Sequence, residues 1–133
     1  MESDADELVA AMRKRSPLYR SFGYAFAGIF NTIRTERNIK IHLLAAALVT
    51  LFGVLLRISV TEWFICLLLF ALVISLELVN TSVEACVDLV TLEKQPLAKK
   101  AKDAAAGAVL FAAIIAAIIG CVIFLPKLAA LFV

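Results

Sequence analysis

Four polar residues recur at helical spacing in a part of the chain that is otherwise apolar. Asn80, Glu84 and Asp88 follow Glu77 at three, seven and eleven residues, which places all four on one face of an α-helix. Fourteen uncharged residues, 63–76, precede them without a break and indicate that the same helix crosses a membrane. Because acidic groups are costly in lipid, the stripe is expected to face protein or water. A polar packing seam, or a soluble helix, would be the alternative.

The carboxylates of this stripe suggest two kinds of chemistry. Glu77 and Glu84 are about 10.5 Å apart along the helix axis, too far for one small cation, so a second carboxylate is needed beside Glu84. Glu36, just before the first expected span, is the candidate. Two carboxylates completed by phosphate and water form a site for Mg²⁺ with a nucleotide rather than for zinc or iron. Glu77 lies deeper and is suited to act as a general base for a hydroxyl that arrives through the membrane.

Other polar residues support a nucleotide site less strongly. Lys102 can hold phosphate oxygens, and Asp103 can hold a ribose or orient the lysine. Topology alone would also explain Lys102, whereas Asp103 has no ion-pair partner apparent in the sequence. The sequence contains neither a GxxxxGK[ST] loop nor a GxGxxG or HRD-type segment, which excludes the common nucleotide motifs. His42, the only histidine, is interpreted as a packing residue at the membrane interface.

The composition defines what must position these groups. Of 133 residues, 63% are hydrophobic and the mean hydropathy is +0.98, which excludes an ordinary soluble domain and predicts an all-α membrane protein. One domain, 1–133, is expected. Its predicted parts are a polar tail over 1–17, an amphipathic surface helix over 18–37, and transmembrane helices over 38–56, 63–90 and 101–126. The loop before the last span breaks the helix at Pro96.

The basic residues predict the orientation of the chain. All thirteen lysines and arginines except Arg57 and Lys127 fall on one side of the predicted spans, including the cluster at 13–15. Basic residues favour the cytoplasmic side, so we expect a cytoplasmic N-terminus and an exterior C-terminus. The polar stripe then lies at the cytoplasmic end of the second span, with Asp88 nearest the water and Glu77 deepest.

Three segments together resemble the bacterial integral-membrane diacylglycerol kinase/undecaprenol kinase family, from about Tyr24 to Lys127. ELVNTSVEACVD, residues 77–88, fits the family's E-x-x-N-[TS]-x-x-E-x-x-x-D pattern. AKDAAAGAV (101–109) and RTERN (34–38) are the other two matches, in family order. TERN, PLAKKAKDAAAGAV and IFLPKL are most like the Gram-positive, undecaprenol kinase branch. The other branch carries an arginine near the position of Pro17, and neither Arg15 nor Arg20 is assigned to replace it.

The resemblance implies a fold, a reaction and a set of site residues. The fold would be three transmembrane helices and an N-terminal surface helix, assembled as a homotrimer. The reaction would be ATP-dependent phosphorylation of a membrane lipid alcohol, with no nucleic acid as a partner. Glu77 would be the catalytic base, supported by Asn80, and Glu36 and Glu84 would bind Mg²⁺. The residues expected to bind ATP and its metal are Tyr24, Glu36, Glu84, Asp88, Glu93, Lys94, Gln95, Lys102 and Asp103.

Undecaprenol is the expected acceptor, and diacylglycerol is the alternative, because the site would be the same for both. Two other classes of protein would also carry intramembrane carboxylates. A small ion-coupled transporter or channel subunit would line a pore with the stripe and would not consume ATP. A scaffold or assembly factor would tolerate the loss of Glu36 and Glu84.

Overall fold

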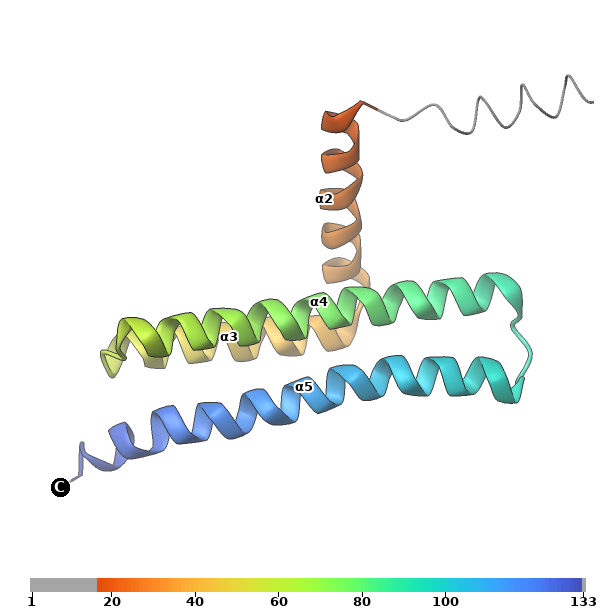
Figure 1. The fold of residues 1–133 in the computed structure, drawn as a ribbon. Coiled ribbons are helices and arrows are strands. Elements are labelled where there is room, and N and C mark those ends of the chain that lie inside the picture. Colours follow the sequence, from red (N-terminus) through yellow and green to blue (C-terminus); the bar gives the residue numbers. More distant parts are fainter. Residues whose placement is uncertain (1–16, 133) are drawn as a thin grey trace, which may run out of the picture. The chain divides into compact units, whose positions relative to one another are not determined.

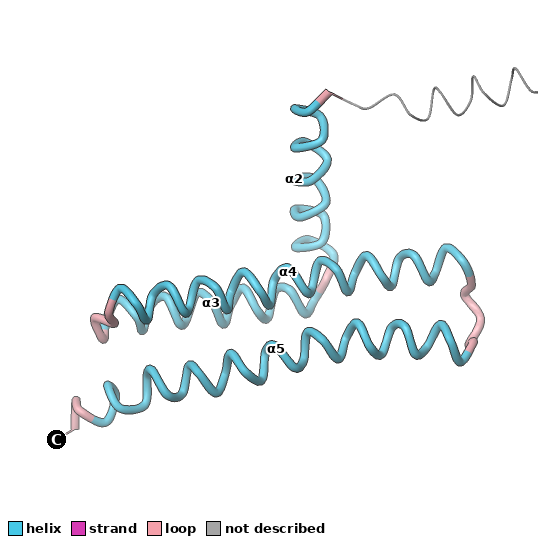
Figure 2. Tube along the Cα trace, in the orientation of Figure 1, coloured by secondary structure: helices cyan, strands magenta, loops and turns pink. Residues whose placement is uncertain are grey.

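The structure is a computed structural model, and it describes residues 17–132. The expected polar tail, with its basic cluster at 13–15, lies outside the described residues except for Pro17. Four helices make up almost all of the described chain (Figures 1 and 2). They are α2 (Leu18–Thr35), α3 (Arg37–Leu55), α4 (Val60–Val90) and α5 (Pro96–Ala129). Three of them, α3, α4 and α5, are long and apolar enough to cross a membrane, so the all-helical prediction with three spans is confirmed.

The chain divides into two compact units between Arg34 and Thr35. The first contains nearly all of α2, whose aromatic side chains at Phe22, Phe26 and Phe30 are exposed. Within this helix the Thr32 hydroxyl donates a hydrogen bond to the Gly28 carbonyl oxygen, at 2.9 Å. The second unit is the three-helix bundle that carries the acidic stripe.

Helices α4 and α5 form the main hairpin of the bundle. They run antiparallel side by side and are joined by the loop 91–95 (Figure 1). Helix α3 packs on α4 and touches α5. A small apolar core of Ile58, Cys66 and Ile123 closes the end of the bundle near the α3–α4 turn. The acidic stripe occupies the other half of α4, so the core holds the helices together away from the polar residues.

The α3–α4 turn is fixed by a close approach between two helices. A Cβ atom on Gly53 would lie 2.8 Å from Cη2 and 2.9 Å from Cζ2 of Trp63, closer than side-chain atoms approach in packed interiors. Arg57 adopts a left-handed conformation with φ of 52°, which lets the chain reverse within a few residues. The absence of a side chain at Gly53 therefore allows the indole to seat against α3.

Local sequence signals extend two helices beyond the predicted spans. Helix α4 begins at Val60 rather than Trp63 because Ser59 and Glu62 form a capping box, in which each side chain accepts a hydrogen bond from the other residue's backbone N–H. Glu62 also lies 3.2 Å from Lys127 Nζ and so links the start of α4 to the end of α5. Helix α5 begins at Pro96, five residues before the predicted span, since proline is favoured in the first turn of a helix.

Candidate functional site along helix α4

The deepest carboxylate of the stripe is buried among the three bundle helices. Glu77 is 3% exposed and Asn80 7%. Both line a pocket of about 180 Å³. Burial of an acidic side chain requires polar partners, so the contacts of these two residues decide what the pocket can do. Asn38, Ile41 and His42 of α3 and Ala106, Val109, Leu110 and Ala113 of α5 complete the lining.

The partner of Glu77 is His42. Its Nε2 atom lies 3.2 Å from Glu77 Oε1, and its side chain remains 23% exposed. The interpretation of His42 as a packing residue missed this contact. No local signal predicted it, because His42 stands 14 residues before the turn at 56–59 and Glu77 stands 18 residues after it, so their pairing depends on how α3 and α4 pack.

Asn80 links the buried pocket to the next carboxylate along α4. Its Nδ2 atom donates a hydrogen bond to Glu84 Oε1 at 3.0 Å. Its Oδ1 atom is buried and has no hydrogen-bond partner among the described residues. A buried acceptor without a donor is uncommon in folded proteins. The amide therefore both orients Glu84 and presents an oxygen suited to a hydroxyl or a cation.

Exposure rises steadily along the stripe towards the end of α4. The Glu77 side chain is 4% exposed, Glu84 is half-buried, and the Asp88 side chain is 47% exposed. One face of α4 thus presents a buried carboxylate, Glu77, at one end and an exposed carboxylate, Asp88, at the other.

A second pocket, of about 620 Å³, lies where α4 ends and α5 begins. The chain makes this pocket by reversing direction through 91–95, so both helix ends contribute side chains. Six of the residues predicted to bind nucleotide line it together, namely Asp88, Glu93, Lys94, Gln95, Lys102 and Asp103; Val87, Thr91, Leu92, Pro96, Ala98 and Lys99 also contribute.

Two ion pairs organise the charges of this second pocket. Lys102 Nζ lies 2.6 Å from Asp88 Oδ1 and connects α5 to α4. Lys99 forms an ion pair with Asp103 one turn later in α5. The expectation that Asp103 lacked a partner was therefore wrong, since the i, i+4 spacing of Lys99 and Asp103 supplies one. Lys99 is also a lining residue that the sequence interpretation left out.

Glu36 and Glu84 lie on the same side of the His42–Glu77 contact. Glu36 stands six residues before His42, and Glu84 stands seven residues after Glu77. Since α3 and α4 run antiparallel, the His42–Glu77 contact places both glutamates beyond that contact, in the part of the bundle away from the α3–α4 turn. Glu36 is the N-cap of α3 with extended backbone, and its side chain makes no capping bond.

No group of three or more metal-ligating side chains occurs within residues 17–132. Glu84, Asn80 and Glu36 carry oxygens of the kind that Mg²⁺ prefers, and their assignment as its ligands stays a prediction. Tyr24, predicted to contact ATP, is an exposed residue of α2 in the other unit, so its contribution stays a prediction.

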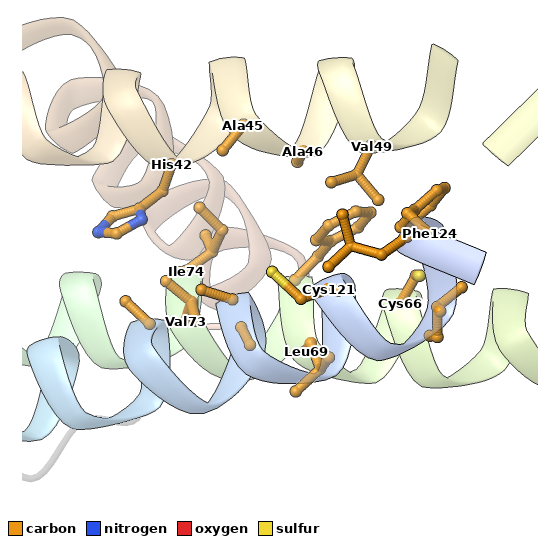
Figure 3. A pocket seen from close by; sticks show the side chains of 17 residues that line it. His42, Ala45, Ala46, Val49, Cys66, Leu69, Val73, Ile74, Cys121 and Phe124 are labelled. Atoms are coloured by element: carbon orange, nitrogen blue, oxygen red, sulfur yellow. The ribbon is translucent and has the colours of Figure 1, made fainter. Parts of the chain in front are cut away.

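An apolar cavity of about 370 Å³ runs along the bundle from His42 towards the opposite end. Its lining combines small side chains such as Ala45, Ala46 and Ala117 with larger ones such as Phe124. Figure 3 shows His42 at one end of this lining and Phe124 and Cys66 at the other. His42 is the only strongly polar side chain in the lining, and with Ala113 it is shared with the pocket of Glu77.

Comparison with known proteins gives consistent matches. Residues 23–124 match the family described as prokaryotic diacylglycerol kinase. An undecaprenol kinase of Bacillus subtilis is 53% identical over 83% of this chain and 89% of that protein. A diacylglycerol kinase of Synechocystis is 43% identical over 85% of this chain and 65% of that protein. One of Pseudomonas aeruginosa is 35% identical over 61% of this chain and 66% of that protein.

Proposed function

The chain belongs to the prokaryotic diacylglycerol kinase family, and on this premise we propose that it transfers the terminal phosphoryl group of ATP to undecaprenol in the membrane. The family resemblance of the sequence is confirmed by these matches. The choice of undecaprenol rests on the Bacillus subtilis relative, which is matched over nearly its whole length.

The observation that carries the proposal is the presence of two unlike pockets along α4. The pocket of Glu77 is small, the side chains of Glu77 and Asn80 are buried beside it, and it shares His42 and Ala113 with the apolar cavity. The pocket of Lys102 is larger, exposed and lined by lysines. Glu77 and Asp88 are eleven residues apart, about 16 Å along the helix, with Glu84 between them. A lipid hydroxyl and a nucleotide can thus approach Glu84 from opposite sides.

The second pocket has the properties of a phosphate-binding site. Lys94, Lys99 and Lys102 line it, and ammonium groups form strong, charge-assisted hydrogen bonds with phosphate oxygens. Ala98, in the first turn of α5, also lines this pocket, and backbone N–H groups at the start of a helix favour anions. We assign ATP to this pocket, with Asp88, Glu93, Gln95 and Asp103 around it.

Glu84 and Glu36 are the residues that would hold Mg²⁺. The orphaned Asn80 Oδ1 atom beside Glu84 fits such a site, because a hard cation prefers oxygen ligands. When bound, the cation would neutralise charge on the transferred phosphoryl group. The protein would hold the ligand oxygens in place, and the hydrogen bond from the Asn80 amide does so for Glu84.

Glu77 is assigned as the general base. The acceptor hydroxyl gives its proton to the Glu77 carboxylate while its oxygen bonds to the terminal phosphorus and ADP leaves. Because Glu77 is buried, water competes poorly with the lipid alcohol as the acceptor. Positioning and electrostatics supply most of the rate enhancement in phosphoryl transfer, so these few residues suffice.

The assembly and topology of the protein form part of the same proposal. At most 22% of any spanning window is buried within the chain, so the helices leave broad apolar faces, and we infer a homotrimer with the N-terminus and the loop 91–95 in the cytoplasm. We infer that α2 lies in the interface, with its exposed aromatic residues towards lipid. Light scattering in detergent would show a monomer if the trimer is wrong. Protease access to loop 91–95 from the exterior would contradict the topology.

The decisive experiment measures phosphorylation of undecaprenol and diacylglycerol side by side with purified protein, ATP and Mg²⁺. We expect undecaprenol to be preferred, and we expect Glu77→Gln to lose at least about 100-fold in kcat. Glu62→Gln, the same exchange at the other end of α4, is the matched control and should retain activity. A strong preference for diacylglycerol would show that diacylglycerol, rather than undecaprenol, is the acceptor. Substantial turnover by Glu77→Gln would show that Glu77 is not the general base.

A further inference from the structure

His42 contacts the proposed base and also lines the apolar cavity. Its Nε2 atom lies 3.2 Å from Glu77 Oε1, and it borders both the pocket of Glu77 and the long apolar cavity. A molecule with a hydrocarbon chain in the cavity and a hydroxyl near Glu77 would therefore pass His42. No other imidazole is available, since the chain has a single histidine.

We infer that His42 is a positioning residue for Glu77 and sets which carboxylate oxygen meets the acceptor hydroxyl. The inference rests on the proposed function. A carboxylate with one oxygen held by an imidazole has a fixed plane, and its other oxygen is left for the proton of the substrate. This follows the general arrangement in which a third group orients the catalytic base. A misoriented carboxylate would not lie within hydrogen-bond reach of the proton that it must accept.

Geometry separates this role from simple packing. The contact is made by Nε2, the ring nitrogen farther from the backbone. The side-chain amide of glutamine reaches to about the position of Nε2, whereas that of asparagine ends near Nδ1. A residue that only fills space would not distinguish the two amides in this direction, because asparagine and glutamine offer the same hydrogen-bonding groups.

The role also predicts which kinetic constant changes. The proposed ATP pocket lies at the α4–α5 loop, and His42 is not among its lining residues. Loss of an interaction needed only as the proton moves lowers kcat and leaves ground-state binding unchanged. The KM for ATP should therefore stay within about twofold of the unaltered protein while kcat falls.

The test compares His42→Ala, His42→Asn and His42→Gln with the unaltered chain, by kcat and KM for ATP on undecaprenol in detergent micelles. We expect kcat to fall about 10- to 100-fold in His42→Ala, a part of what a general base contributes, and to recover more in His42→Gln than in His42→Asn. Thr50→Val is the matched control on α3, because the Thr50 hydroxyl donates to the Ala46 carbonyl one turn earlier and bonds to no other helix within residues 17–132. It should match the unaltered chain.

The outcomes separate the inference from the proposed function. If the unaltered protein phosphorylates neither undecaprenol nor diacylglycerol, the proposed function fails. If it is active and all three His42 variants stay within twofold in kcat, or if glutamine and asparagine are equally impaired, the positioning role is overturned. A loss in His42→Ala as large as in Glu77→Gln, with no recovery in His42→Gln, would also overturn it and would favour the imidazole as the base. If His42→Ala does not elute as a monodisperse peak in size-exclusion chromatography in detergent, the positioning role is judged from the kcat of His42→Gln and His42→Asn alone.

Discussion

Replacement of Lys102 by glutamine distinguishes a ligand-binding lysine from a stabilising one. Lys102 pairs with Asp88 across the α4–α5 junction at 2.6 Å, and the two side chains are 37% and 47% exposed. An ion pair with this much exposure contributes at most about 1 kcal/mol to stability. The thermal unfolding of Lys102→Gln in detergent should therefore differ little from that of the unaltered protein.

The effect on ATP should be larger than the effect on stability. A hydrogen bond from an ammonium group to a charged oxygen contributes about 1.5–3 kcal/mol, and every 1.4 kcal/mol is a factor of ten in affinity. If Lys102 binds a phosphate oxygen, its loss should raise the KM for ATP by about 10- to 150-fold. The same substitution should leave the KM for the lipid acceptor unchanged, since the acceptor is assigned to a different pocket.

Lys100→Gln is the matched control for charge. Lys100 is exposed, lies two residues away in α5 and does not line the pocket, so its replacement removes the same charge without removing a pocket group. Initial rates over a series of ATP concentrations, at fixed Mg²⁺ and acceptor, give the KM for ATP of each variant, and a second series over acceptor concentrations at fixed ATP gives the KM for the lipid. An equal rise of the KM for ATP in the two variants would refute the assignment of the pocket, as would an unchanged KM in Lys102→Gln.

Two further substitutions test the metal site and the turn. Glu84→Gln keeps an oxygen for the Asn80 amide but removes the charge, so the Mg²⁺ concentration for half-maximal activity should rise by roughly tenfold or more; an unchanged Mg²⁺ titration would exclude Glu84 as a ligand. Gly53→Ala should lower the melting temperature, because the overpacking against Trp63 costs about 1–3 kcal/mol and exceeds the gain of about 1 kcal/mol in helix propensity. In a Trp63→Leu background the same exchange should be neutral or stabilising, and an equal loss there would show that the indole is not the cause.

Local patterns were sufficient to predict the helices and to select many of the residues that line the two pockets along α4. Uncharged runs identified the three spans because a membrane demands long apolar helices. The helical spacing of the stripe placed Glu77, Asn80, Glu84 and Asp88 on one face. The starts of α4 and α5 were missed by three and five residues, although the Ser59–Glu62 capping box and the position of Pro96 are both visible in the sequence.

Contacts between helices could not be predicted in the same way. The contact of His42 with Glu77 and the ion pair of Lys102 with Asp88 join different helices, and both depend on how the helices are rotated and shifted against one another. Side-chain packing around the whole bundle sets these quantities, so no single segment encodes them.

By itself, the sequence determined that the chain is helical, that it lies in the membrane, and which residues can carry charge into it, since these properties follow from local composition and helical period. Only the tertiary structure decided that Glu77 is buried beside an imidazole and that six separate polar residues border one pocket at the α4–α5 junction. The physical reason is that burial and pairing depend on neighbours brought together by packing, whereas helix formation and membrane partition depend mainly on the segment itself.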